Sequence, residues 1–357
     1  MNGWRRSDSF FRGIIGFGLI IILGIAVIFV VRAFENASIK DFWEDESFAL
    51  GTLKSTTYHQ LFTRGISGQG SGAPLDYVFI KILDSAYQPF VSSIPHNIFY
   101  RMNSIFWDLI AGVVVALLSI RFLYQRRDDN GIIVMQLILI SFALSAFYFK
   151  PNIFHFALEM RPYALWNSLW YVLLGLIMLR GISIWTLSLG VLLALTSSGA
   201  LVQIPALALA QFFIRIFDKA TLSEVLKETM LIFILPFFIA VYYALHIPRF
   251  TYISSLHEYQ AYTHGFYVYW ISRWYVPVLS GIGIFWSAWD LRWRGCAVVF
   301  ITMLLLYFAA PVINAKILSN GFFFTTRQYL YHDLVIPLFC LMLAMVLPRI
   351  GRFYENT

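Results

Sequence analysis

Charged residues are scarce in this sequence. Only 13% of its 357 residues are Asp, Glu, Lys or Arg, whereas 59% are hydrophobic and 18% are aromatic. A soluble domain of this length needs about a quarter of its residues charged to cover its surface. This deficit of charge argues against a soluble protein. The sequence also lacks a basic stripe on a soluble domain, so nothing in it indicates a nucleic-acid partner. We therefore expect most of the chain to lie in a membrane.

Cysteine is almost absent. The two that occur, Cys296 and Cys340, both fall within apolar runs. Two cysteines in such positions provide neither a disulfide framework nor a metal-binding cluster. The cysteine content therefore implies neither kind of stabilisation.

Long apolar runs separated by charged breaks dominate the chain. Several approach the roughly 20 residues that cross a hydrocarbon core about 30 Å thick. They predict an all-α polytopic transmembrane bundle of about ten spans, built as a single membrane domain over residues 1–357. The fifth and sixth spans are so close that they form either a tight hairpin or a broken pair. The expected spans are 13–33, 104–123, 131–149, 163–180, 183–197, 199–216, 229–246, 267–287, 295–314 and 333–348.

The distribution of basic residues predicts the orientation. The net charge is +7, and short cytoplasmic loops collect Lys and Arg. Basic residues before the first apolar run indicate an uncleaved signal anchor with its N-terminus inside. Basic residues in each alternate short loop favour a multi-pass protein of the plasma (inner) membrane with both termini cytoplasmic. These are Arg126, Arg127, Arg180, Arg215, Lys219, Lys227, Arg292, Arg294, Arg349 and Arg352.

Residues 34–103 are the one large segment expected outside the membrane. Apolar stretches broken by charge predict short helices lying along the outer surface. The glycine-rich stretch 65–72 has no Gly-Lys-Ser/Thr sequence after it, so a flexible loop is favoured over a phosphate-binding loop.

Polar residues of the expected spans gather near the outer ends of the helices. A transporter more often places its polar site at the bilayer midplane. Because the polar residues here lie toward the outer ends of the spans, chemistry at the outer face is favoured. With residues of the outer loops, these side chains would ring a cavity that opens outward. The set comprises Asp108, Asn167, Gln203, Arg273 and Asn314 from spans, and Glu159, Arg161, His257, Glu258 and Arg327 from loops.

Two short stretches carry candidate chemistry. The stretch 41–46, Asp-Phe-Trp-Glu-Asp-Glu, follows the first span. Its carboxylates suit proton abstraction or metal binding, or they are a solvated cluster that caps a helix. The stretch 159–163, Glu-Met-Arg-Pro-Tyr, precedes the fourth span. Its Arg suits phosphate binding, or the Arg and Tyr anchor a helix end at the interface.

The order of these stretches resembles the C-type (GT-C) membrane glycosyltransferases, such as the protein O-mannosyltransferases and the lipid A aminoarabinose transferases. Ala73 stands where that family usually has a second Pro, and Asp108 is not part of the family pattern. The matching stretches are 44–49, 73–77, 101–104, 156–165 and 327–330.

This resemblance implies an inverting glycosyltransferase that moves a sugar from a polyprenyl-phosphate carrier to a glycan, lipid or protein acceptor at the extracytoplasmic face. It implies that Asp45 is the general base and that Glu46 orients either this base or the acceptor. Arg161, Arg327 and Tyr163 would bind the donor phosphate. We expect no essential metal or other cofactor, although Asp45, Glu46 and Glu159 could supply carboxylate ligands. The expected substrate-pocket residues are Glu159, Asp108, Arg273 and His257.

Other functions remain open from the sequence. A transporter or lipid flippase would move the carrier lipid without forming a sugar-transfer product. A polymerase or ligase of lipid-linked oligosaccharides would use a diphosphate donor. A scaffold of an envelope complex would tolerate neutralisation of the acidic stretch.

Overall fold

The computed structural model is helical wherever the chain is described. Within the described residues no strand occurs, which confirms the all-α prediction for that part of the protein. The described residues are 2–66, 73–87, 89, 91, 93–124, 130–149, 154, 157–180, 182–197, 200–217, 220–246 and 278.

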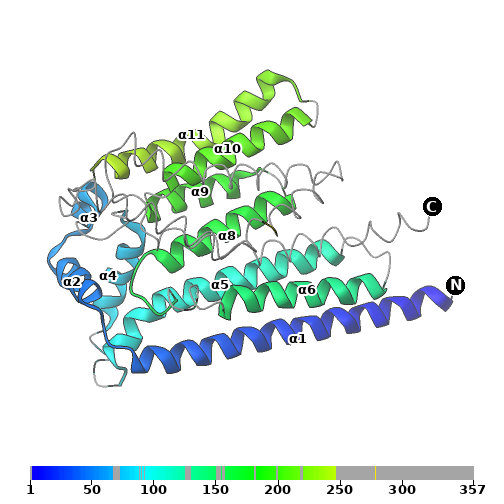
Figure 1. The fold of residues 1–357 in the computed structure, drawn as a ribbon, viewed down its shortest axis with the longest axis horizontal. Coiled ribbons are helices and arrows are strands. Elements are labelled where there is room, and N and C mark those ends of the chain that lie inside the picture. The colour runs from blue at the N-terminus through cyan, green and yellow to red at the C-terminus, as the bar shows by residue number, and fades with distance from the viewer. Residues whose placement is uncertain are drawn as a thin grey trace.

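The longer helices of this region run side by side (Figure 1). Helix α5 packs against α1, α6 and α8; α9 packs against α8 and α11; and α10 packs against α11. The bounds are α1 (Asn2–Ile39), α5 (His96–Tyr124), α6 (Asn130–Phe149), α8 (Tyr163–Arg180), α9 (Ile184–Thr196), α10 (Ala200–Phe217) and α11 (Leu222–His246).

Each expected span within the described residues coincides with a helix. The agreement is closest for α8, where the expected bounds 163–180 are those observed. The expected fifth and sixth spans are two separate helices, because α9 ends at Thr196 and α10 begins at Ala200. The expected spans 295–314 and 333–348 lie outside the described residues, as does 267–287 apart from Val278.

Length and composition mark one described helix as able to cross a membrane unaided. This is the 27-residue segment Gly13–Ile39 of α1. Helix α11 passes the same test only when its parts Leu222–Leu231 and Phe233–Tyr243, bent by 43°, are taken together. Val134–Phe149 and Ile184–Thr196 are apolar but shorter. An N-terminal apolar helix is thus present, as expected for an anchor or a signal sequence.

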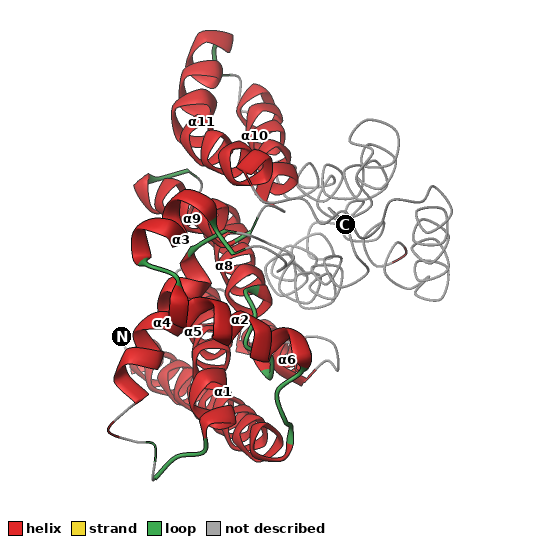
Figure 2. Ribbon diagram, turned by 90° about the vertical axis from the view of Figure 1, so that its left-hand side faces the viewer, coloured by secondary structure: helices red, strands yellow, loops and turns green. Residues whose placement is uncertain are grey.

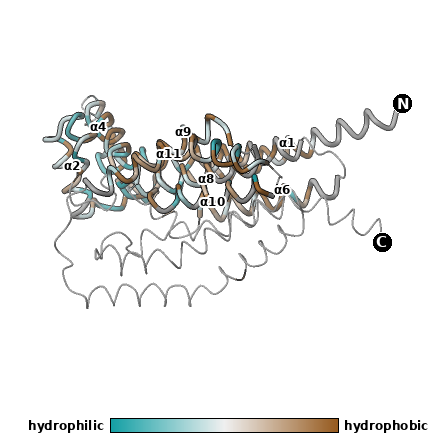
Figure 3. The backbone as a smooth tube through the Cα atoms, turned by 90° about the horizontal axis from the view of Figure 1, so that it is seen from above, coloured by the Kyte–Doolittle hydropathy of each residue, from teal (hydrophilic) through white to brown (hydrophobic). Residues whose placement is uncertain are grey.

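Three short helices gather at the end of the bundle opposite the N-terminus. They are α2 (Glu44–Ser55), α3 (Tyr58–Arg64) and α4 (Leu75–Tyr87). Figure 2 looks onto this end and shows them in front of the longer helices. Figure 3 shows hydrophilic residues in the same region. The short helices expected in residues 34–103 are thus present within 44–87, whereas residues 34–39 belong to α1 and residues 96–103 to α5.

Local sequence signals fix the ends of α3. The Thr57 hydroxyl accepts the backbone N–H of Gln60 at 3.2 Å, and the Gln60 side chain accepts the backbone N–H of Thr57 at 2.8 Å. This reciprocal capping pairs two donors that an isolated helix start leaves unbonded. Gly65 ends the helix with φ 62°, a backbone conformation that glycine adopts without a steric penalty.

Two apolar clusters hold these parts together. The larger cluster runs along the bundle. The smaller one lies among the short helices and also includes Met160, which is fully buried. The loop before α8 is therefore packed into the core of the α2–α4 region. The smaller cluster consists of Ala49, Leu50, Leu53, Leu61, Ile66, Tyr77, Ile80, Tyr100 and Met160.

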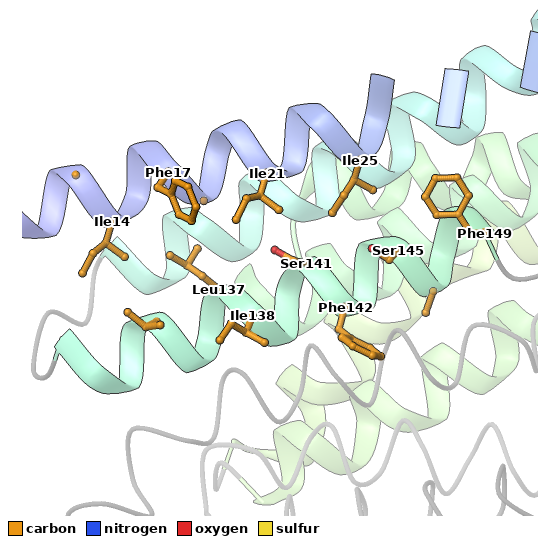
Figure 4. Close-up of a pocket in the computed structure, with 14 residues that line it drawn as sticks. Ile14, Phe17, Ile21, Ile25, Leu137, Ile138, Ser141, Phe142, Ser145 and Phe149 are labelled. Carbon is orange, nitrogen blue, oxygen red and sulfur yellow. The ribbon is translucent and has the colours of Figure 1, made fainter. Parts of the chain in front are cut away.

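An apolar groove of about 1290 Å³ lies between α1 and α6 (Figure 4). Ile14, Phe17 and Ile21 line it from α1, and Ser141 and Ser145 line it from α6. A groove with so few polar groups suits hydrocarbon better than water.

Candidate functional site

The structure brings together most of the predicted site residues that it describes. Asp45 and Glu46 lie in the first turn of α2. Glu159 and Arg161 lie in the loop directly before α8, and Tyr163 is the first residue of that helix. Of Asp45 only the backbone is described. The predicted residues Arg273, Arg327 and His257 lie outside the described residues.

Glu46 joins the acidic stretch to the loop before α8. Its Oε1 atom accepts the backbone N–H of Met160 at 2.6 Å, across 114 positions of sequence. Its Oε2 atom accepts the backbone N–H of Trp43 at 2.9 Å and Nη2 of Arg101 at 3.0 Å. The side chain is 1% exposed. Both oxygens are thus engaged, which fits an orienting residue better than a group that exchanges protons with substrate.

Arg101 secures the junction between α1 and α2. Its side chain is fully buried. Nη2 donates to the carbonyl oxygen of Asp41 at 2.8 Å, and Nη1 donates to the carbonyl oxygens of Lys40 and of Ala37, the latter at 3.3 Å. The last carbonyls of a helix lack partners within it and carry partial negative charge, so a guanidinium is a favourable cap. Sequence reasoning included Arg101 in a matching stretch but did not give it this role.

A polar stripe on α5 continues from Arg101. Ser104 and Asp108 follow at spacings of three and four residues, which place all three on one helix face. The Ser104 hydroxyl donates to the carbonyl oxygen of Glu159 at 2.6 Å. The Ser168 hydroxyl of α8 donates to Oδ1 of Asp108 at 2.7 Å. Helix α5 thereby binds the α1–α2 junction, the loop before α8, and α8 itself.

Lys40 lies among the charged groups of three separate segments. Its Nζ atom is 3.8 Å from Oε1 of Glu159. Burial lowers the pKa of the Lys40 ammonium; the carboxylates of Glu159 and Glu46 oppose this, whereas the cations Arg101 and Arg161 add to it. These interactions show that both predicted stretches share one electrostatic environment. Lys40 was not identified from sequence, because its neighbours come from distant segments.

The loop before α8 holds Arg161 and Tyr163 in a buried position. Their side chains are 6% and 5% exposed. The carbonyl oxygen of Pro162 accepts the backbone N–H of Trp166 at 2.8 Å and so begins α8. Proline suits a helix start, because its missing N–H would be unbonded there in any case. Pro162 thus fixes where the helix begins, directly beside Arg161.

Other polar residues predicted near the outer helix ends are buried in the bundle. Asn167 on α8 is 2% exposed and Gln203 on α10 is 4% exposed. The indole Nε1 of Trp166 donates to Oε1 of Gln203 at 2.8 Å and so links α8 to α10.

Asp76 is a buried carboxyl in the first turn of α4. It is 1% exposed, and its Oδ1 atom accepts Nδ2 of Asn103 at 2.7 Å. Oδ1 of Asn103 accepts the indole N–H of Trp107 at 2.9 Å. Burial raises the pKa of Asp76 to about 7, and the Asn103 hydrogen bond opposes that rise. Asp76 fell in a matching stretch of the sequence, but its burial depends on how α4 packs on α5.

Among the described residues, no three His, Cys, Asp or Glu side chains gather where they could hold a metal ion. Comparison with protein-family models, with curated proteins and with solved structures finds no match to this chain. The functional argument therefore depends on the chemistry of the site. Carboxylates and cations converge beside the short helices at one end of the bundle, an arrangement able to orient a hydroxyl group and bind an anion.

Proposed function

We propose that this protein is an inverting glycosyltransferase that moves a sugar from a polyprenyl-phosphate carrier to an acceptor at the extracytoplasmic membrane face. The single observation that supports this most is the hydrogen bond between Glu46 and the backbone of Met160. It places the residue after Asp45 next to the residue before Arg161. A general base and a phosphate-binding cation need such proximity.

A multi-pass membrane location is part of the proposal. Large apolar side chains point outward from several helices, while charged and amide side chains are buried between them, as suits hydrocarbon surroundings. We propose about ten spans in one domain in the plasma (inner) membrane, with cytoplasmic termini and α2–α4 outside. Outward residues include Phe17 (64% exposed), Ile20 (67%), Phe142 (68%), Leu231 (63%) and Phe238 (60%).

Sided labelling tests this topology. Cys296 and Cys340 are first replaced by Ser, and single cysteines are then introduced at Trp43, which is 37% exposed, and at Arg126, in a basic segment expected on the cytoplasmic side. In intact cells, an impermeant maleimide should label the cysteine at position 43 and not the one at position 126. The reverse pattern would place the site on the cytoplasmic side.

The proposed reaction is one in-line displacement. Asp45 removes the proton of the acceptor hydroxyl, and that oxygen forms a bond to the anomeric carbon of the sugar. The bond between the anomeric carbon and the phosphate oxygen breaks, and its electron pair leaves with the lipid phosphate. Arg161, Arg327 and Tyr163 stabilise the leaving charge. Attack opposite the leaving group inverts the anomeric configuration.

Glu46 and Arg101 contribute by position. They fix the first turn of α2, which carries Asp45, against the end of α1 and the loop before α8. Holding the reacting groups in fixed relative positions lowers the entropic part of the activation barrier. The proposed substrate pocket comprises Glu159, Asp108, Arg273 and His257, and no metal is required in this scheme.

Two other functions would differ from the proposed glycosyltransferase in their product or in their donor. A transporter or flippase would move the carrier lipid and yield no glycosylated product. An oligosaccharide polymerase or ligase would use a lipid diphosphate. The carboxylates and cations of the candidate site, Glu46, Glu159, Lys40 and Arg101, lie at the end of the bundle that carries α2–α4 rather than midway along the helices, which favours the transferase.

The choice of donor separates these functions. Purified protein is incubated with radiolabelled polyprenyl-phosphate sugars or polyprenyl-diphosphate sugars and with a cell-envelope extract as acceptor. We expect product from monophosphate donors alone. The rate of sugar transfer should fall strongly with Arg161→Ala and less with Arg161→Lys, which keeps the positive charge. Product from diphosphate donors alone would establish the polymerase or ligase, and lipid movement without product would establish the transporter.

A further inference from the structure

Lys40 lies between the end of α1 at Ile39 and the acidic stretch 41–46. Its side chain keeps 18% of its surface exposed. The Nζ atom also lies 5.2 Å from the ring centroid of Trp43, an exposed side chain in the same segment. Lys40 is thus the cation of the described site that solvent reaches most readily, since Arg101 is fully buried and Arg161 is 6% exposed.

The protein holds the Lys40 ammonium loosely. Nζ donates to the carbonyl oxygen of Leu158 at 3.4 Å and is 3.8 Å from the nearest Glu159 oxygen. Charge-assisted N–H···O bonds are usually about 2.7–2.9 Å long. An ammonium has three donors, so both distances leave capacity for a closer partner. Arg101 differs, because its two terminal nitrogens already bind four oxygen atoms of the protein.

We infer that Lys40 binds the phosphate of the lipid-linked donor, exchanging its long contact with Glu159 for short bonds to phosphate oxygens. This inference rests on the proposed function and adds a phosphate contact to it. A compact ammonium on a flexible stem can follow a phosphate as charge develops on it, whereas a buried guanidinium fork is fixed. Lys40 precedes Asp45 by five residues, so one segment supplies both a phosphate contact and the base.

The neighbouring charges support a ligand that is an anion. Glu159 and Glu46 favour the charged form of Lys40 against the effect of burial. Arg101 and Arg161 add two further cations near Lys40, and the ammonium of Lys40 is the one that solvent reaches most readily, so the ligand it can bind is an anion.

Binding measurements on the purified full-length protein test the inference. The probes are a polyprenyl phosphate, inorganic phosphate and phosphatidylglycerol, which separate the lipid-linked phosphate from free phosphate and from anionic lipid in general. The variants are Lys40→Gln, Lys40→Arg, and Lys54→Gln as matched control, because Lys54 is an exposed lysine in the last turn of α2. Thermal melting checks that each variant folds.

We expect Lys40→Gln to weaken binding of polyprenyl phosphate about tenfold or more, since it removes a charge-assisted contact. Lys40→Arg should restore most of the affinity, and Lys54→Gln should leave it unchanged. As pH rises, the affinity of the wild type for polyprenyl phosphate should fall at a lower pH than that of Lys40→Arg, because burial lowers the pKa of Lys40.

Equal binding by wild type and Lys40→Gln would overturn this inference and leave the proposed function standing. An equal loss of phosphatidylglycerol binding would also overturn it, since that result indicates general attraction to anionic lipid. Tight binding of inorganic phosphate alone would overturn the inference too, since it indicates a soluble phosphate ligand and not a lipid-linked one. Absence of polyprenyl-phosphate binding by the wild type would overturn both the inference and the proposed function.

Discussion

Replacing Glu46 by Ala is expected to lower the free energy of unfolding by about 3–5 kcal/mol, because it leaves a buried guanidinium without its carboxylate. The Nη2 atom of Arg101 and Oε2 of Glu46 are 3.0 Å apart, and the two side chains are 0% and 1% exposed. The backbone N–H groups of Trp43 and Met160 lose their acceptor as well. Each buried donor left unbonded costs about 1–3 kcal/mol, so the upper part of the range is expected.

A second ion pair in the same chain provides a matched control. Arg215 and Glu228 join α10 to α11 at 2.8 Å, with side chains 32% and 42% exposed. A pair that solvent screens contributes about 0–1 kcal/mol, so Glu228→Ala should have a small effect. Both variants are compared by thermal melting and by reversible unfolding in mixed detergent micelles.

Removing both members of the buried pair completes the experiment. Glu46→Ala combined with Arg101→Met should be less destabilising than the sum of the single changes, because no unpaired charge remains. The reasoning is refuted if Glu46→Ala costs no more than Glu228→Ala, or if the effects of Glu46→Ala and Arg101→Met are additive.

Three further predictions concern contacts near the site. Folding raises the pKa of Asp76 from 3.8 to about 7, so the wild-type free energy of unfolding should fall as pH rises through that window; Asp76→Asn should flatten this fall in melts across the range, and an unchanged pH profile would contradict it. Gly112→Ala places a Cβ against the buried Tyr148 side chain, so melting should show a loss of about 1–3 kcal/mol; the same change should cost less in a Tyr148→Ala background, and an equal cost in both backgrounds would contradict the prediction. Ser168→Ala removes the hydrogen bond to Asp108 at 2.7 Å and should cost about 1–3 kcal/mol, a cost that Asp108→Asn reduces.

The helices could be predicted because their cause is local. Apolar runs of sufficient length give helices, and charged or small residues interrupt them, so α6, α8, α9 and α10 lie within a few residues of their expected bounds. Helix α5 begins at His96, before its expected span at 104, because its polar first turns pack on the short helices instead of continuing the apolar run.

The candidate site was predicted only in part. The stretches with Glu46 and Arg161 were recognised from residue type and order, and the structure places them together. The roles of Lys40, Arg101 and Asp76 could not be predicted, because each depends on packing between segments far apart in sequence. Burial of Asp76, for example, arises where α4 covers α5. Periodicity within one helix does not encode that contact.

The measurement that tests the central claim most directly is sugar transfer from labelled polyprenyl-phosphate donor by the wild type, Asp45→Asn and Asp41→Asn. Asp41 lies in the same stretch, has an exposed side chain, and contacts Arg101 through its backbone carbonyl. The account predicts product from wild type and Asp41→Asn, and a loss of about 100-fold or more for Asp45→Asn. Full activity of Asp45→Asn would contradict it.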